Sequence, residues 1–123
     1  MNPKQECKKL INSFKYAIEG FISSFKTERN MKIHILAMIL VIAIGVYLRL
    51  TVMEWCIIAL AISLVIGAEL FNTAIETIVD MVSPEKNPKA KLAKDISAAA
   101  VLALAIGAIV IGIIIFTPKL MIF

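Results

Sequence analysis

Charged residues are scarce in this chain: Lys, Arg, Asp and Glu make up 18% of its 123 residues, against about 25% in ordinary soluble domains. Hydrophobic residues make up 60%, above the roughly 45–50% of a soluble domain, and the mean hydropathy is +0.90. A chain of this length forms a single domain, which cannot bury so much apolar side chain in water. The composition therefore disfavours disordered tails and water-soluble enzymes, and it predicts a protein whose solvent is largely lipid.

Cysteine and histidine are also rare. The two cysteines, Cys7 and Cys56, lie in a basic and an apolar segment respectively, so a mutual disulfide is not expected. Because His34 is the single histidine, a packed or hydrogen-bonded imidazole is favoured over a metal ligand. The net charge of +4 accompanies no DNA or RNA recognition motif, so no nucleic-acid partner is predicted.

Long apolar runs predict three transmembrane helices. Residues 96–116 contain no charge and are long enough, at about 1.5 Å per residue, to cross a hydrocarbon core of about 30 Å. Residues 33–48 form a shorter span, whose flanking Lys32 and Arg49 can snorkel to the interface. Residues 55–82 form the third span, with polar groups on one side of its inner half. The fold class predicted for residues 1–123 is therefore an all-α integral membrane protein.

Residues 8–26 precede these spans and have a different pattern. Apolar residues recur there at helical spacing, with basic and polar residues between them, which predicts a basic amphipathic helix in the membrane surface. Packing of this segment on the other helices alone is the alternative. Seven of the 13 Lys and Arg residues precede residue 33 and four lie in the connector 83–95, so both segments are predicted to be cytoplasmic and the C-terminus to lie outside.

The inner half of the third predicted span carries an acidic stripe. At about 100° per residue, five polar residues share one helix face: Glu69, Asn72, Thr73, Glu76 and Asp80. Glu69 lies about 9 Å inside the hydrocarbon boundary, where a carboxylate is costly unless it is paired, metal-bound, hydrated or protonated. The stripe predicts a site at which a lipid-borne group meets a water-borne group. A polar helix-packing seam and a proton relay are the alternatives.

Further charged residues lie at the cytoplasmic ends of the predicted spans. Lys94 and Asp95 begin the last span, and residues 28–32 precede the first. Carboxylates together with nucleotide phosphates commonly hold Mg²⁺, and lysine is a compact phosphate partner. The chain contains no Walker Gly-rich loop and none of the His-Arg-Asp or Asp-Phe-Gly motifs, so it is neither a P-loop enzyme nor a protein kinase.

Three stretches together resemble the prokaryotic-type diacylglycerol kinase family. They are Glu28-Arg29-Asn30 with His34, Glu69-Leu-Phe-Asn-Thr-Ala-Ile-Glu76 with Asp80, and Asn87-Pro-Lys-Ala-Lys-Leu-Ala-Lys-Asp95. The first stretch, the Asn-Pro-x-Ala-Lys run and the ending Ile115-Phe-Thr-Pro-Lys-Leu120 are similar to the undecaprenol kinase branch. The resemblance covers nearly the whole chain. It implies a homotrimer in the bacterial inner membrane, with sites built between neighbouring subunits.

The resemblance also implies roles for individual residues. Glu69 matches a general base that takes the proton from a lipid hydroxyl, and Glu28 and Glu76 match carboxylates that bind Mg²⁺ with ATP. The other matched positions fall in two groups: Asn72, Asp80, Lys94 and Asp95 around the phosphates and the catalytic carboxylate, and Tyr16, Glu85, Lys86 and Asn87 near the nucleotide.

Together these features predict an MgATP-dependent lipid kinase that converts undecaprenol to undecaprenyl phosphate. In this interpretation Glu69 accepts the hydroxyl proton while Lys94 steadies the transferring group. Diacylglycerol, which would give phosphatidic acid, is the second candidate substrate. A non-enzymatic membrane protein that uses the acids as a proton relay is the remaining alternative, but a relay has no need of Glu28, Lys94 and Asp95 at the cytoplasmic ends.

Overall fold

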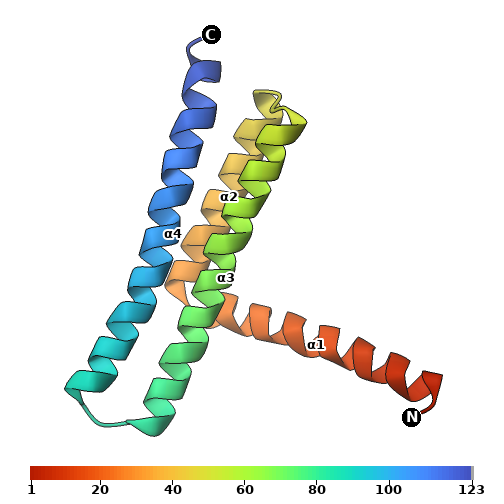
Figure 1. The fold of residues 1–123 in the computed structure, drawn as a ribbon, viewed down its shortest axis with the longest axis vertical. Helices are drawn as coiled ribbons and strands as arrows, with labels where there is room; N and C mark the ends of the chain where they lie inside the picture. The colour runs from red at the N-terminus through yellow and green to blue at the C-terminus, as the bar shows by residue number, and fades with distance from the viewer. Residues whose placement is uncertain (123) are drawn as a thin grey trace.

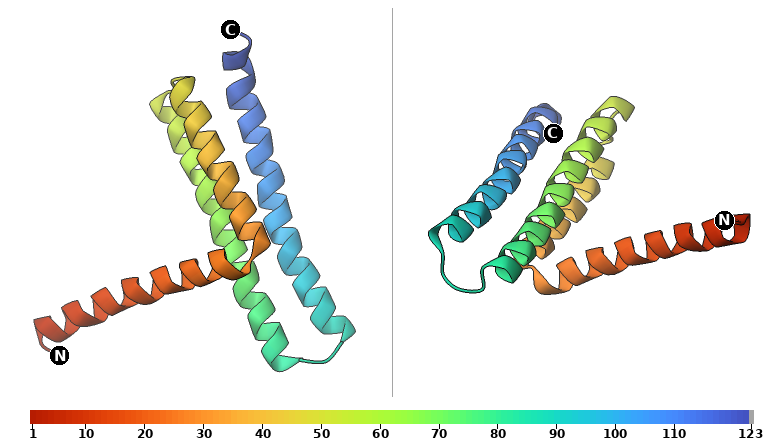
Figure 2. Two further views of the ribbon diagram at one scale, coloured as in Figure 1. Left: turned by 180° about the vertical axis from the view of Figure 1, so that it is seen from behind. Right: turned by 60° about the horizontal axis from the view of Figure 1, so that its bottom comes forward.

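The computed structural model describes residues 1–122, and these residues form helices and short connections. The helices are α1 (Pro3–Thr27), α2 (Arg29–Tyr47), α3 (Val52–Val82) and α4 (Pro88–Leu120) (Figure 1). α2, α3 and α4 run alongside one another, whereas α1 leaves the bundle at a steep angle (Figure 2). The prediction of an all-helical protein is confirmed.

Within residues 1–122, α2, α3 and α4 are each long and apolar enough to cross a membrane, as predicted. The 19 residues of α2 rise about 29 Å, close to the roughly 30 Å of a hydrocarbon core. The 31 residues of α3 rise about 46 Å, which exceeds that thickness by about 16 Å. One end of α3 must therefore project beyond the hydrocarbon.

The connection between α3 and α4 is shorter than the predicted 83–95 segment. Asn87 is the N-cap of α4, where its side-chain oxygen accepts a hydrogen bond from the backbone N–H of Lys89 at 2.8 Å, and Pro88 occupies the first helical position. Both residue types are favoured at these places. As a result Lys94 and Asp95 lie within α4 rather than in a loop.

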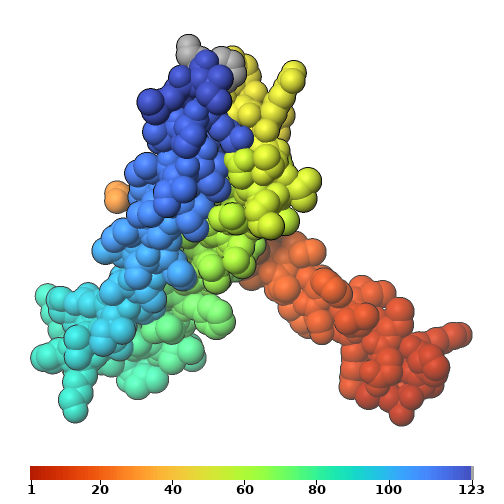
Figure 3. All heavy atoms as spheres, turned by 45° about the horizontal axis from the view of Figure 1, so that its top comes forward, coloured from red at the N-terminus to blue at the C-terminus, as the bar shows by residue number. Residues whose placement is uncertain are grey.

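α1 begins with a capping box and is longer than the predicted 8–26 segment. Asn2 Oδ1 accepts a hydrogen bond from the Gln5 backbone N–H at 2.9 Å, and Gln5 Oε1 accepts one from the Asn2 N–H at 3.2 Å. Ser24 is the one buried residue of α1. Glu28 alone joins α1 to α2, since it is both the C-cap of α1 and the N-cap of α2. Figure 3 shows α1 standing clear of the bundle.

The α2–α3 turn is closely packed. Trp55 lies against Gly45, where an added Cβ would be 2.8 Å from the indole and 2.9 Å from the Leu50 side chain. Arg49 has a positive φ of 55°, which lets the chain reverse direction here. Lys119 Nζ, near the end of α4, forms an ion pair with Glu54 Oε1 at 3.1 Å. This end of the bundle is therefore held by packing and by charge.

The buried core of a single chain is small. Few apolar side chains are buried within residues 1–122, and they lie mainly along α3 and the α2–α3 turn: Met31, Leu48, Leu50, Ile58, Ala61, Val65 and Val101. Large apolar residues on every helix are exposed instead. Such extensive exposed apolar surface is typical of a chain covered by lipid or by other subunits.

Candidate functional site

Glu69 is the most deeply buried polar residue in the described chain, with 1% of its surface exposed. It lies in the middle of α3, and neither of its carboxylate oxygens has a hydrogen-bond partner within residues 1–122. The Nε2 atom of His34, on α2, lies 3.6 Å from Glu69 Oε2. Burying a carboxylate is unfavourable unless it is paired, so this arrangement points to a functional requirement.

Asn72 and Glu76 continue the polar face of α3 beyond Glu69. The Asn72 amide donates a weak hydrogen bond to Glu76 Oε1 at 3.4 Å, while Asn72 Oδ1 is buried and without a partner. The Thr73 hydroxyl donates to the backbone carbonyl of Glu69 at 3.0 Å. Three neighbouring buried polar atoms, the two oxygens of Glu69 and Oδ1 of Asn72, thus have no hydrogen-bond partner within residues 1–122, which is uncommon in a folded protein.

These side chains border a small cavity between α2, α3 and α4, which we call the polar chamber. Its volume is about 240 Å³. The walls are contributed by Asn30, Ile33, His34, Glu69, Asn72, Ala98, Val101, Leu102 and Ala105. The chamber is large enough for a hydroxyl group and its neighbouring carbon atoms.

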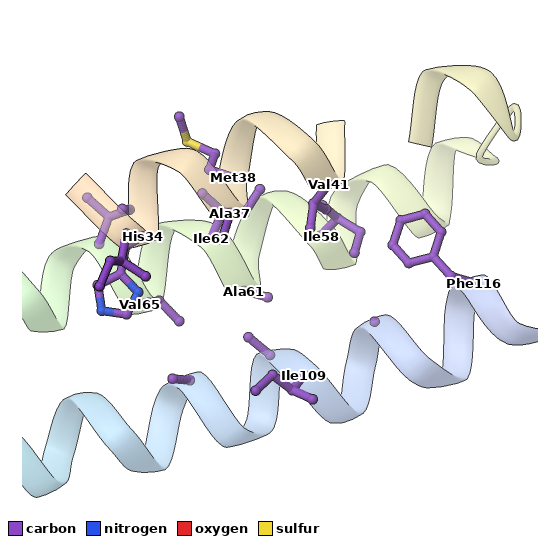
Figure 4. Close-up of a pocket in the computed structure, with 15 residues that line it drawn as sticks. His34, Ala37, Met38, Val41, Ile58, Ala61, Ile62, Val65, Ile109 and Phe116 are labelled. Atoms are coloured by element: carbon purple, nitrogen blue, oxygen red, sulfur yellow. The ribbon is translucent and has the colours of Figure 1, made fainter. Parts of the chain in front are cut away.

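A longer cavity, which we call the apolar groove, extends from the polar chamber toward the α2–α3 turn. Its volume is about 390 Å³, and it lies between α2 and α3 on one side and α4 on the other (Figure 4). His34 lies at one end of the groove and Phe116 at the other (Figure 4). Ile33, His34 and Ala105 line both cavities, so the groove adjoins the chamber that Glu69 lines.

A third cavity, the loop pocket, lies at the opposite end of α3, beside the connection to α4. Its volume is about 750 Å³, and three lysines are among its lining residues: Lys86, Lys91 and Lys94. Lys94 forms an ion pair with Asp80, which links α4 to α3. Asp80 and Glu85 line the same pocket and Lys91 is paired with Asp95, so of the three lysines Lys86 has no ion-pair partner within residues 1–122. Lysines at such a pocket suit an anionic ligand such as phosphate.

The remaining predicted site residues are distributed around these cavities. Glu28, at the α1–α2 joint, and Glu76 both interact electrostatically with Glu69. Asp95 is exposed and forms an ion pair with Lys91 one turn away. Glu85 and Asn87 line the loop pocket along with Lys86, and Tyr16 is exposed on α1, away from the bundle. One chain thus brings Glu69, Asn72 and Glu76 together, while Tyr16 stands apart.

Within residues 1–122 no group of three or more His, Cys, Asp or Glu side chains is arranged to hold a metal by itself.

Reasoning from the sequence missed two features of this site. The apolar groove was not predicted, because it depends on the spacing between α2 and α4. His34 was interpreted as a packed or hydrogen-bonded imidazole, without a named partner, and the structure places it beside Glu69. The signal in the sequence for a role of His34 in the site was its place, with Glu28-Arg29-Asn30, in one of the three stretches that carry the family resemblance.

The fold and the cavities define a helical membrane protein with a buried carboxylate between an apolar groove and a lysine-lined pocket. The profile of the prokaryotic diacylglycerol kinase family matches residues 15–116. The chain therefore belongs to this family and is a membrane-embedded lipid kinase.

Three curated relatives show how far the similarity extends. An undecaprenol kinase of Bacillus subtilis (strain 168) is 39% identical over 117 residues, covering 95% of each chain. A diacylglycerol kinase of Synechocystis is 38% identical over 121 residues, covering 98% of this chain and 69% of the relative. A diacylglycerol kinase of Haemophilus influenzae is 36% identical over 108 residues, covering 87% of this chain and 92% of the relative. Relatives named for either substrate thus match at comparable identity.

Proposed function

We propose that this protein transfers the γ-phosphoryl group of ATP to the hydroxyl of undecaprenol. The observation that carries the proposal is the position of Glu69, a buried carboxylate without hydrogen-bond partners that lines the polar chamber, next to the apolar groove. An alcohol whose tail lies in the groove would present its hydroxyl to Glu69. The match to an undecaprenol kinase over 95% of both chains supports the same substrate.

The chemistry of the groove favours a polyprenol over a diacylglycerol. Its lining contains one polar side chain, that of His34. Diacylglycerol carries two ester groups next to the hydroxyl, and buried ester carbonyls need hydrogen-bond donors. Undecaprenol has no polar group besides its hydroxyl. The hydrocarbon tails themselves discriminate little, because a buried CH₂ group gains about 0.8 kcal/mol in protein and in membrane alike.

In the proposed reaction the lipid hydroxyl oxygen attacks the γ-phosphorus of ATP. A new oxygen–phosphorus bond forms, the bond to the β-phosphate oxygen breaks, and its electron pair leaves with ADP. Glu69 accepts the hydroxyl proton, while Asn72 lies one turn away to hold the reacting groups. Lys94, held toward α3 by Asp80, and the neighbouring Asp95 belong to the phosphate end of the site.

We assign the nucleotide to the loop pocket, where Asp80, Glu85, Lys86 and Asn87 would surround it. Tyr16, which stands apart within one chain, would reach the nucleotide from a neighbouring subunit of the proposed homotrimer. The lysines of this pocket would neutralise phosphate charge. The lipid and the nucleotide would then approach Glu69 and Lys94 from opposite ends of the polar face of α3.

Glu28 and Glu76 are the proposed protein ligands of Mg²⁺. Both interact electrostatically with Glu69, so two carboxylates lie near the reacting carboxylate, and neither forms an ion pair within residues 1–122. Mg²⁺ is commonly held by one or two carboxylates together with phosphate oxygens and water, so these residues fit it. When bound, Mg²⁺ would offset the charge that develops on the phosphates.

The membrane arrangement follows the same proposal. We place α1 in the cytoplasmic membrane surface, because it combines exposed Leu10, Phe14 and Ile18 with several lysines. The joint at Glu28 would then mark the membrane boundary, with the loop pocket in the cytoplasm and the C-terminus outside. The extensive exposed apolar surface of α2 and α4 supports a homotrimer with composite sites.

Diacylglycerol is the second candidate substrate, since relatives with that name match at 36–38% identity. Purified protein in detergent micelles, supplied with MgATP and each lipid in turn, should release ADP. We expect kcat/KM for undecaprenol to exceed that for diacylglycerol by at least about tenfold, equivalent to roughly 1.4 kcal/mol of transition-state preference. Equal or reversed values would assign the protein to diacylglycerol. Absence of ADP release with both lipids would favour the proton-relay alternative.

A further inference from the structure

His34 borders the proposed site but has no role in the reaction described above. It projects from α2 to the junction of the apolar groove and the polar chamber, and it lines both. Its side chain is 19% exposed, while the carboxylate that it faces is 1% exposed. An imidazole at this point is neither an ordinary lipid contact nor a surface group.

The surroundings of Glu69 show why a nitrogen donor matters there. The groups that act electrostatically on Glu69 are His34 from α2, Glu28 from the α1–α2 joint, Glu76 from α3 and the Asn72 amide. Two of these are acids, which repel a carboxylate, and the Asn72 amide nitrogen is directed to Glu76 Oε1. No described cationic side chain of α4 pairs with Glu69. His34 is therefore its one ion-pair partner within residues 1–122.

The distance between the His34 imidazole and the Glu69 carboxylate fits a hydrogen bond that forms when substrate binds. The separation between His34 Nε2 and Glu69 Oε2 is 3.6 Å, slightly longer than the 2.7–3.2 Å of a hydrogen bond. Catalytic hydrogen bonds are commonly long before substrate binds and shorten afterwards. The Nε2 atom carries a hydrogen both in the protonated imidazole and in one neutral tautomer, so either form can donate.

We propose that His34 is a positioning residue for Glu69, an inference that rests on the proposed kinase function. Its Nε2–H donates to Glu69 Oε2 and holds the carboxylate plane, so that Oε1 faces the polar chamber and accepts the proton of the lipid hydroxyl. The imidazole does not receive that proton and makes no bond to the phosphate. Because His34 also borders the groove, it sets the orientation of Glu69 at the place where the alcohol arrives.

The test compares His34→Leu, which removes the donor, with His34→Gln, which keeps an N–H donor on a side chain of similar reach. We expect His34→Leu to lower kcat at least about tenfold while KM for the lipid changes by less than about twofold, as for a group that acts only in the transition state. His34→Gln should recover most of the lost kcat. Leu36→Ala is the matched control, because Leu36 is exposed on α2 and lines neither cavity.

A double-mutant cycle distinguishes positioning from a merely structural role. If His34 acts through Glu69, His34→Leu should lower the residual kcat of Glu69→Gln by less than about twofold, because the carboxylate to be oriented is gone. Equal losses in both backgrounds, an unchanged kcat in His34→Leu, or a loss confined to KM would each overturn the inference.

Activity assays separate failure of this inference from failure of the proposed function. If the wild-type protein phosphorylates no lipid, the proposed function fails, whereas a wild-type kinase that is insensitive to His34→Leu refutes only the role of His34. Thermal unfolding tests the contact without reference to catalysis. In detergent micelles His34→Leu should lower Tm, because Glu69 loses its partner, and adding Glu69→Gln should restore it. A Tm that falls equally with and without Glu69→Gln would contradict the contact itself.

Discussion

Substituting Glu69 by Gln should change activity and stability in opposite directions. The side chain keeps its size, but the buried carboxylate becomes a neutral amide. A general base contributes about 10²–10⁴-fold to rate, so kcat should fall at least about a hundredfold, equivalent to about 2.7 kcal/mol of activation free energy. A loss of activity together with a gain in stability is typical of a catalytic residue whose burial destabilises the folded protein.

The stability change follows from the burial of Glu69. With 1% of its surface exposed and no hydrogen bond to either oxygen within residues 1–122, the carboxylate carries a desolvation cost that the 3.6 Å contact with His34 offsets only in part. An unsatisfied buried polar group costs roughly 1–3 kcal/mol and a charged one more, so the amide should be more stable by about 1 kcal/mol or more. Tm in detergent micelles should therefore rise.

Two assays on one preparation check this prediction: ADP release with saturating MgATP and undecaprenol, and thermal unfolding in the same detergent. Glu19→Gln is a suitable control. Glu19 is exposed on α1, so the substitution makes the same change of charge away from the cavities. Near-normal turnover in Glu69→Gln would refute the assignment of the base. A lower Tm with lost activity would mean that the carboxylate is a structural partner of His34 and no more.

Two further predictions concern the metal ligands and the packed turn. Glu28→Ala and Glu76→Ala should each raise the Mg²⁺ concentration needed for half-maximal ADP release, with partial rescue at high Mg²⁺, and an unchanged Mg²⁺ titration in both would make these carboxylates structural. Gly45→Ala should destabilise the protein by about 1–3 kcal/mol in thermal unfolding, because the new methyl group would lie 2.8 Å from Trp55. Gly20→Ala, where no atom lies within 4 Å, should be neutral or stabilising, and equal effects at both glycines would contradict the packing argument.

The helices were predictable because the bilayer imposes a simple requirement on the sequence. A run of about 20 apolar residues has few alternatives to a spanning helix, so α2, α3 and α4 followed from hydropathy. The polar face of α3 followed from the 100° rotation per residue, and Glu69, Asn72 and Glu76 do lie together. Both results depend on geometry within a single helix.

Helix ends and contacts between helices were harder to predict. The start of α4 at Pro88 and of α1 at Pro3 depends on capping side chains, those of Asn87 and Asn2, which hydropathy does not weigh. The contact of His34 with Glu69 depends on how α2 is rotated against α3. A sequence pattern fixes which residues share a face of one helix, but it does not fix which faces of two helices meet.

The joint between α1 and α2 is a single residue, Glu28, about which the long helix α1 can tilt. The 25 residues of α1 rise about 37 Å, so a tilt of about 10° around Glu28 would carry its far end through about 6 Å while Glu28 itself barely moves. Because no other residue separates the two helices, the angle between them is set by the backbone torsions of Glu28, φ −106° and ψ 116°. The direction in which α1 points is therefore mechanically tied to the position of Glu28, whose carboxylate acts electrostatically on Glu69.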